Sequence, residues 1–369
     1  MKWDIENSLK AYEEYLIPGK ALEGPFEGWV IQGLLGRGGM ALVYLIEQGG
    51  DSSRFSGNRS VLKIMPGYLV SEFLVNEYES LKRLQSPHIV RLRTGGESFL
   101  PVQGSGICAE IGYLELEYCP GGTLEEYRRS FEGPMPAFYA AKCMVSIFQG
   151  LAVAHQSGIC HGDICTRNIL LDGGETLKIS DFGLARVEGQ HNKGRQGRVR
   201  YFPPEAFGWK TSPANYKWDI WACGIIYLTL IQGVHPLENL EESKCEKTLK
   251  SFENLFSHPY IKLPEYYEEA LKKQLNLTSD TLEGRLAFTL HQTLCRENRA
   301  SAEYLCKLTK KALREFTEEG QETLYGEHYH HYFKKNMGKT LQWREPPKIS
   351  PEQMKGSGNP SEDITYIPS

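Results

Sequence analysis

The chain reads His161-Gly162-Asp163-Ile164-Cys165-Thr166-Arg167-Asn168 and, a short segment later, Asp181-Phe182-Gly183. The first stretch places an Asp and an Asn five residues apart in one polar loop. The segment between the two stretches predicts a hairpin, since two short apolar runs flank the turn residues Gly173 and Gly174. One carboxylate can orient a hydroxyl, while an amide and a second carboxylate supply the oxygen ligands that Mg²⁺ takes. The pattern therefore indicates phosphoryl-transfer chemistry.

A second group of residues lies upstream of this loop. Apolar and β-branched residues predict antiparallel strands over 29–47 and 59–65, and the glycine-rich stretch 36–44 (GRGGMALVY) lies among them. Glycines allow a backbone to approach phosphate groups closely. Lys63 lies in an apolar strand and needs an anionic partner if its ammonium is buried, which Glu77 on the next predicted helix can supply. Taken singly, these features also fit a plain hairpin turn, an exposed lysine and a surface glutamate.

The order of these motifs resembles that of the eukaryotic-type protein kinases. The resemblance covers roughly residues 29–318. Two further motifs strengthen it, because Pro203-Pro204-Glu205 resembles the family's Ala-Pro-Glu and Asp219–Gly224 resembles its Asp-x-Trp-x-x-Gly helix. Arg299 falls where the family places the buried partner of that glutamate.

The resemblance implies an α+β protein kinase-like fold with two lobes, a small β-rich N-lobe and a larger helical C-lobe. It also implies ATP and Mg²⁺ as cofactors and a protein as the phosphoryl acceptor. Asp163 would orient the substrate hydroxyl, Lys63 would contact the ATP phosphates, and Asn168 and Asp181 would hold Mg²⁺. The residues implied in catalysis are Asp163, Lys63, Glu77 and Arg167. Those implied in nucleotide binding are Gly36, Arg37, Gly38, Gly39, Met40, Ala41, Val43, Val61, Lys63, Glu117 and Cys119.

Gly162 departs from the family pattern, in which many members carry an arginine that grips a phosphorylated activation loop. The corresponding segment 189–201 (GQHNKGRQGRVRY) contains no Ser or Thr and four basic residues, Lys193, Arg195, Arg198 and Arg200. Both halves of a phosphate-and-arginine switch are missing from the sequence. We expect activity that does not require phosphorylation of this segment, with Tyr201 packed rather than phosphorylated. We favour a solvated basic loop over one that selects acidic substrates.

The type of acceptor hydroxyl is indicated less clearly. Cys165 replaces the lysine that Ser/Thr kinases usually carry two residues after the catalytic Asp, and Arg167 resembles the tyrosine-kinase arrangement. Gly38-Gly39-Met40 instead resembles the bacterial Ser/Thr branch. We predict a Ser/Thr protein kinase, with a tyrosine or dual-specificity kinase as the alternative. Two other classes share part of the pattern, the aminoglycoside- or choline-like phosphotransferases and the nucleotide-binding pseudokinase scaffolds.

The composition is that of an ordinary globular protein of 369 residues, 40% hydrophobic and 24% charged. A net charge of −4 gives no reason to expect nucleic acid or an anionic membrane as partner. The nine cysteines are scattered, which favours a reducing compartment. The N-terminus lacks an apolar signal segment, and the longest apolar run, Ile220–Ile231, is too short to cross a bilayer. We expect a cytoplasmic protein, with secretion as an effector as the alternative.

The sequence periodicity predicts four regions: an extension over 1–27, an N-lobe over 28–117, a C-lobe over 118–319 and a tail over 320–369. The tail is expected to be largely disordered from about residue 336, where polar residues, Pro and Gly dominate. A short amphipathic helix is expected over 4–16. Further helices are expected over 71–85, 123–131, 136–157, 218–232, 265–275, 283–295 and 301–318, and further strands near 88–93 and 111–118.

Overall fold

The computed structural model describes residues 5–49, 58–67, 73–101, 108–174, 176–190, 197–208, 215–238, 282–294 and 299–317. The chain divides into two compact units. The first, called the sheet unit, is drawn from Met1–Arg83 and Val90–Tyr118, and the second, called the helical unit, from Leu84–Ile89 and Cys119–Gly338. The helix predicted over 265–275 and the disorder predicted from about residue 336 lie outside the described residues.

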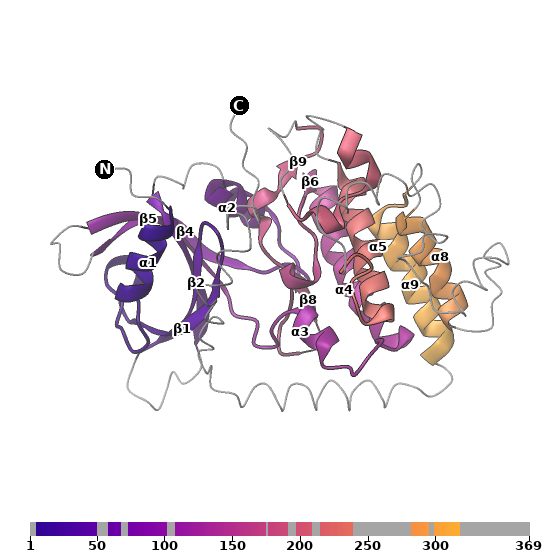
Figure 1. Cartoon of the computed structure of the whole chain (residues 1–369), viewed down its shortest axis with the longest axis horizontal. Helices are drawn as coiled ribbons and strands as arrows, with labels where there is room; N and C mark the ends of the chain where they lie inside the picture. Colours follow the sequence, from indigo (N-terminus) through magenta and orange to yellow (C-terminus); the bar gives the residue numbers. More distant parts are fainter. Residues whose placement is uncertain are drawn as a thin grey trace, which may run out of the picture. The chain divides into compact units, whose positions relative to one another are not determined.

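The sheet unit contains a five-stranded antiparallel sheet of order β1-β2-β3-β5-β4 (Figure 1). Its strands are β1 (Trp29–Arg37), β2 (Leu42–Gln48), β3 (Arg59–Pro66), β4 (Leu92–Pro101) and β5 (Cys108–Glu117). Side chains alternate between the two faces of a strand. Val61 and Lys63 of β3 therefore share one face with Val43, the cross-strand partner of Lys63. Three residues predicted to bind the nucleotide thus lie on the same face of the sheet.

Helix α2 (Phe73–Arg83) packs against β4 and β5. It buries Leu74, Glu77 and Leu81, whose spacing places them on one side of the helix. Lys82 and Arg83 lie in its last turn, where positive charge complements the helix dipole. The glutamate predicted to be catalytic is thereby turned into the unit rather than toward water.

The N-terminal segment forms part of the core of the sheet unit. Helix α1 (Ile5–Tyr15) and the residue after it contribute Leu9, Tyr12 and Leu16, each at most 4% exposed. These side chains join a hydrophobic cluster with alternate residues of β2 and β3, among them Tyr44 and Leu62. Tyr44 and Leu62 are cross-strand partners on the face opposite Lys63. The predicted amphipathic helix is confirmed, and it covers the face of the sheet that is turned away from Lys63.

The helical unit is built around α4 (Ala137–Gln156), α5 (Tyr216–Gln232), α8 (Leu282–Leu294) and α9 (Ala302–Thr317), which pack side by side (Figure 1). Every residue of α5 from Asp219 to Ile231 is buried, as expected for a central helix that is apolar all round. The short helix α3 (Leu124–Arg129) begins with a capping box between Thr123 and Glu126. Among the described helices, α4 alone is long and apolar enough to cross a membrane, but 72% of that stretch is buried, as in a core helix.

The helical unit also contains two pairs of short antiparallel strands. Strand β6 (Ile159–Cys160) pairs with β9 (Arg186–Val187), and β7 (Ile169–Leu171) pairs with β8 (Leu177–Ile179) as the predicted hairpin. One predicted strand is placed wrongly, because β4 begins at Leu92 and not near residue 88. The reason is that His88 and Ile89 are bound to β8, where the Ile179 N–H donates to the His88 carbonyl at 2.9 Å. The stretch Leu84–Ile89, which the sequence assigned to the N-lobe, therefore belongs to the helical unit.

Candidate active site

Lys63 and Glu77 form a buried ion pair in the sheet unit. The Lys63 Nζ lies 2.6 Å from Glu77 Oε2, and the two side chains are 11% and 1% exposed. Lys63 comes from an interior strand of the sheet and Glu77 from the buried face of α2. Removing one partner of such a pair leaves an uncompensated buried charge. The pair predicted from the order of motifs is present, and it holds the ammonium group in one place.

The glycine-rich loop joins β1 to β2, and the Gly38 N–H donates to the Ala41 carbonyl at 2.9 Å. Gly36, Gly38 and Gly39 all have negative φ, so the backbone conformation does not require glycine here. What the glycines supply is the absence of side chains along the loop. The side chain of Arg37, a residue predicted to bind the nucleotide, donates to Glu13 at 2.8 Å and to Glu6, both on α1.

Glu117, the last residue of β5, and Cys119, two residues after it, were predicted to bind the nucleotide. The Glu117 N–H donates to the Arg91 carbonyl at 3.0 Å, and the Glu117 carboxylate accepts the Arg91 N–H at 2.7 Å. Glu117 is therefore fixed to the start of β4 through both its backbone and its side chain. Cys119 is buried and begins the main part of the helical unit, so the residues predicted for the nucleotide are divided between the two units.

The catalytic-loop stretch His161–Asn168 is anchored by one buried carboxylate from α5. Asp219 accepts the backbone N–H groups of His161 at 2.8 Å and Gly162 at 2.9 Å. Its Oδ2 also lies 3.0 Å from the His155 ring nitrogen Nε2. Burial alone would raise the pKa of Asp219, but these hydrogen bonds hold it below its usual value. Asp219 thus serves as a structural anchor for the catalytic loop.

Asp163, Asn168 and Asp181 are brought together by the β7–β8 hairpin. The Asn168 side-chain amide Nδ2 donates to the Asp163 carbonyl and to Asp163 Oδ2, each at 2.9 Å. The Ser180 N–H, next to Asp181, donates to the Asn168 carbonyl at 2.9 Å. Asp181 itself has φ of 63°, and it is the one non-glycine residue with positive φ within the described ranges. Aspartate tolerates this left-handed conformation better than most residues, and such strain often marks functional positions.

The donor set at this point fits Mg²⁺. Asn168 uses its Nδ2 group on Asp163, which leaves the amide oxygen Oδ1 as an available ligand. The Asp181 carboxylate supplies a second hard oxygen, and Mg²⁺ in phosphate-binding sites takes one or two protein ligands together with phosphate oxygens and water. Burial raises the pKa of Asp163 above its ordinary value, while Arg198 and His161 act in the opposite direction. Across the described residues, no cluster of three or more His, Cys, Asp or Glu side chains suited to a metal is found.

Two arginines close to Asp163, in sequence or in space, have different surroundings. Arg167, predicted to be catalytic, is exposed in the 3₁₀ turn Thr166–Asn168 and makes no hydrogen bond or ion pair with the described residues. Arg198, which was expected to be solvated, donates to Asp163 Oδ2 at 2.6 Å and contacts Cys165 Sγ at 2.8 Å. Two features of the sequence could have predicted the Arg198 contact. They are the basic residues before Tyr201 and the uncharged residue at position 165.

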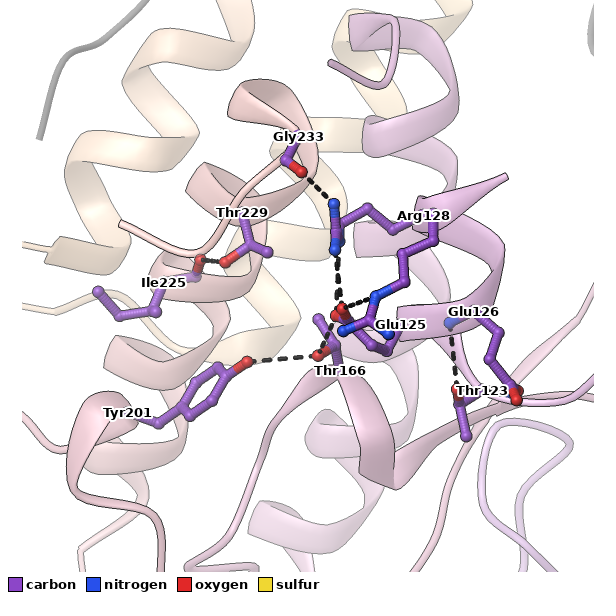
Figure 2. Close-up of polar contacts among 10 residues, drawn as sticks. Thr123, Glu125, Glu126, Arg128, Thr166, Tyr201, Ile225, Thr229 and Gly233 are labelled. Carbon is purple, nitrogen blue, oxygen red and sulfur yellow. Dashed lines mark hydrogen bonds and ion pairs between the residues drawn. The ribbon is translucent and has the colours of Figure 1, made fainter. Parts of the chain in front are cut away.

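A polar network ties the catalytic loop to its surroundings, as Figure 2 shows. The Thr166 hydroxyl donates to Glu125 on α3 at 2.9 Å. The Tyr201 hydroxyl lies 3.3 Å from the same Thr166 hydroxyl. Arg128 donates to Glu125 at 2.7 Å and also to the Gly233 carbonyl at the end of α5. Burial raises the pKa of Tyr201 to about 12, so the phenol stays protonated. Tyr201 is therefore packed, as the sequence predicted.

Glu205 and Arg299 also meet. Arg299 donates to Glu205 through both of its terminal nitrogens, with Nη2 3.1 Å from Oε2. The Arg299 side chain is fully buried and lies over the Trp221 ring at 4.9 Å. The pairing predicted from the motif order is present, and it links the segment after Tyr201 to α5.

Comparison with known proteins agrees with this geometry. A model of the protein kinase domain matches residues 29–314. The chain belongs to the protein kinase family. The expected kinase fold, with a β-rich part and a helical part, is confirmed.

Among similar kinases is the serine/threonine-protein kinase PrkC of Bacillus subtilis, 31% identical over 64% of this chain and 34% of its own length. The serine/threonine-protein kinase grp of Drosophila melanogaster is 31% identical over 60% of this chain and 41% of its own. The probable cell cycle serine/threonine-protein kinase CDC5 homolog of Encephalitozoon cuniculi is 28% identical over 60% of this chain and 45% of its own length. The chain thus spans less than half the length of these relatives.

Proposed function

We propose that this chain transfers the γ-phosphoryl group of ATP to serine or threonine hydroxyls of protein substrates. The observation that carries the proposal is the Asp163 carboxylate, which is 11% exposed, lies beside Asn168 and Asp181 and is held by hydrogen bonds in a fixed direction. The buried Lys63–Glu77 pair supports it, because it fixes an ammonium group that can contact the phosphates of ATP. The relatives whose names print a serine/threonine activity favour that acceptor over tyrosine.

In the proposed reaction, Asp163 orients the acceptor hydroxyl and takes its proton. The hydroxyl oxygen forms a bond to the γ-phosphorus as the bond from that phosphorus to the β–γ bridging oxygen breaks, and ADP leaves. Lys63, fixed by Glu77, would hold the phosphates of ATP. Asn168 and Asp181 would hold Mg²⁺, which offsets the negative charge of the phosphates when bound.

We further propose that phosphorylation of the segment 189–201 is not needed. Its sequence offers no Ser or Thr, and its Tyr201 hydroxyl is occupied by Thr166 while the ring packs on His235 at a centroid distance of 4.9 Å. Gly162 cannot bind a loop phosphate through a side chain. An added Cβ there would lie 3.0 Å from the Leu184 carbonyl oxygen, at a φ of 79° that disfavours side chains. The described end of this segment is thus held by contacts within the protein, including the Arg198–Asp163 ion pair.

A reducing compartment such as the cytoplasm is proposed for the protein. The six cysteines with described side chains are all buried and free of disulfides: Cys119, Cys143, Cys160, Cys165, Cys223 and Cys306. Oxidising compartments favour paired cysteines instead. Protein substrates and ATP are the proposed partners, and the net charge of −4 favours neither nucleic acid nor an anionic membrane.

The experiment uses the full chain, purified after treatment with a phosphatase that is then removed. It is incubated with Mg²⁺ and labelled ATP, in separate reactions with a mixture of protein substrates, with aminoglycosides and with choline. Label on protein Ser or Thr supports the proposal, and intact-mass analysis of the kinase reports whether it has phosphorylated itself. Label found on small molecules alone, nucleotide binding without transfer, or a lag that ends only when position 201 becomes phosphorylated would each contradict part of it.

A further inference from the structure

The Asp163 carboxylate forms an ion pair with Arg198, a residue from a distant part of the chain. Arg198 lies 35 residues after Asp163 in sequence, yet its Nη1 donates to Asp163 Oδ2 at 2.6 Å. The backbone N–H of Arg198 also points at the same carboxylate, 3.3 Å from Oδ1. The preceding residue, Gly197, makes this approach possible. Its φ is 106°, and a Cβ built on it would be only 3.0 Å from the Gly162 carbonyl oxygen.

Cys165 is the uncharged residue of the catalytic loop that lies beside Asp163 and Arg198. It lies two residues after Asp163 and its sulfur contacts Arg198 Nη1 at 2.8 Å. Burial raises the pKa of the Cys165 thiol to about 12, so the thiol is neutral at physiological pH. The guanidinium of Arg198 therefore brings positive charge to a spot where the catalytic loop itself provides only a small neutral side chain.

The two oxygens of the Asp163 carboxylate are bound unequally. Oδ2 accepts from both Arg198 Nη1 and Asn168 Nδ2, whereas among the described residues Oδ1 receives only the longer contact from the Arg198 backbone. Since Gly197 has no side chain, nothing from that residue fills the space beside Oδ1. A substrate hydroxyl can then donate to Oδ1 while Arg198 stays on Oδ2. This geometry favours a catalytic contact over one that blocks the site.

A guanidinium has five N–H donors in a plane, and Nη1 accounts for the contacts to Asp163 and Cys165. Nε and Nη2 make no hydrogen bond to any described residue, and the Arg198 side chain is 38% exposed. Those donors remain available for an anion that arrives beside Asp163. Burial works against the charge of Arg198, but the carboxylates of Asp163 and Asp181 raise its pKa above the ordinary value, so the cation is retained.

We propose that Arg198 is a catalytic residue, which binds the oxygens of the phosphoryl group as it passes to the hydroxyl held by Asp163. This inference rests on the proposed phosphoryl transfer. As the hydroxyl oxygen bonds to the γ-phosphorus and ADP departs, negative charge spreads over the three equatorial oxygens of that group. Nε and Nη2 of Arg198 donate to these oxygens, and the hydroxyl proton goes to Oδ1 of Asp163. Fixed donors aimed at developing charge give the largest single effect in many enzymes.

The test compares the full chain with Arg198→Ala, Arg198→Lys and Arg285→Ala. Arg285 on α8 is the control arginine, because it is 26% exposed, forms an ion pair with Glu315 and takes no part in the network around the catalytic loop. Steady-state transfer to a Ser/Thr protein substrate is measured against ATP concentration, with circular dichroism to confirm folding. We expect Arg198→Ala to lower kcat by roughly 10²- to 10³-fold, the loss typical of removing one such donor. The KM for ATP should change by less than about threefold, because the proposed contact forms in the transition state and not in the complex with bound ATP.

Two readouts separate this role from a structural one. Millimolar guanidinium added to Arg198→Ala should restore part of kcat, and Arg198→Lys should retain more activity than Arg198→Ala. Arg285→Ala should match the unaltered chain. A rise in kcat for Arg198→Ala would mean that the contact is inhibitory and would overturn the inference. So would an unchanged kcat, or a loss that neither lysine nor guanidinium relieves. If the unaltered chain transfers no phosphoryl group, the proposed function fails first, and that result is distinct from these.

Discussion

Shortening Leu9 to alanine should destabilise the sheet unit, although this residue lies outside the part of the chain that matches the kinase family. Leu9 on α1 is fully buried in the cluster that contains Tyr44 and Leu62. Leu→Ala changes at such sites cost about 2–5 kcal/mol, through lost burial and the cavity left behind. Ile17 is the matched control, because it follows the same helix and is 55% exposed. Ile17→Ala should change the free energy of unfolding by less than about 0.5 kcal/mol.

Native-state hydrogen exchange is the assay, because it reports the opening free energy of each unit separately. At about 1.4 kcal/mol per tenfold, the Leu9→Ala cost should speed exchange of protected β2 and β3 amides by about 30- to 4,000-fold. Amides of α4 and α5 in the helical unit serve as the internal reference and should keep their rates. If Leu9→Ala and Ile17→Ala leave β2 and β3 equally protected, α1 is not part of the core and the reasoning is refuted.

Four other predictions follow from single positions. Glu77→Gln should lower stability by about 3–5 kcal/mol in urea unfolding and reduce kcat/KM, because it leaves Lys63 buried without its anion; equal stability would contradict the burial of the pair. Gly162→Ala should cost about 1–2 kcal/mol, and more than Gly158→Ala, since both have positive φ but only Gly162 has a carbonyl oxygen 3.0 Å from the new Cβ. Tyr44→Phe should be neutral or slightly stabilising by thermal unfolding, as the buried hydroxyl has no hydrogen-bond partner among the described residues. His235 has its pKa lowered to about 4 by burial, so stability should fall as pH drops from about 6.5 toward 4, and His235→Gln should flatten that part of the urea-midpoint profile.

Much of the fold could be predicted from the sequence, because its signals are local. The amphipathic period of α1, the alternation in β2 and β3, and the turn residues of the β7–β8 hairpin each act over a few residues. The order of motifs located the two ion pairs of Lys63 and Arg299 because it gave both partners of each. The assignment of His88 and Ile89 failed because their apolar run pairs with β8, which is remote in sequence.

The site was predictable in its residue types and less so in its contacts. The attachment of Arg37 to Glu6 and Glu13 depends on α1 packing against the sheet unit, which no local pattern encodes. The placement of Arg198 depends on a positive φ at Gly197. A glycine in the sequence does not predict that conformation, because glycine adopts positive and negative φ about equally readily. The catalytic, nucleotide-binding and metal-binding roles of the remaining residues stay predictions until they are assayed.

The central claim is that Asp163 directs the γ-phosphoryl group of ATP to serine or threonine. The most direct measurement is phosphoamino-acid analysis of a protein substrate after incubation with Mg²⁺, labelled ATP and either the unaltered chain or Asp163→Asn. Asparagine keeps the size of the side chain but cannot take the proton. The account predicts phosphoserine or phosphothreonine with the unaltered chain and a loss of at least about 10²-fold in the variant. Equal labelling by the two proteins, or label on tyrosine alone, would contradict it.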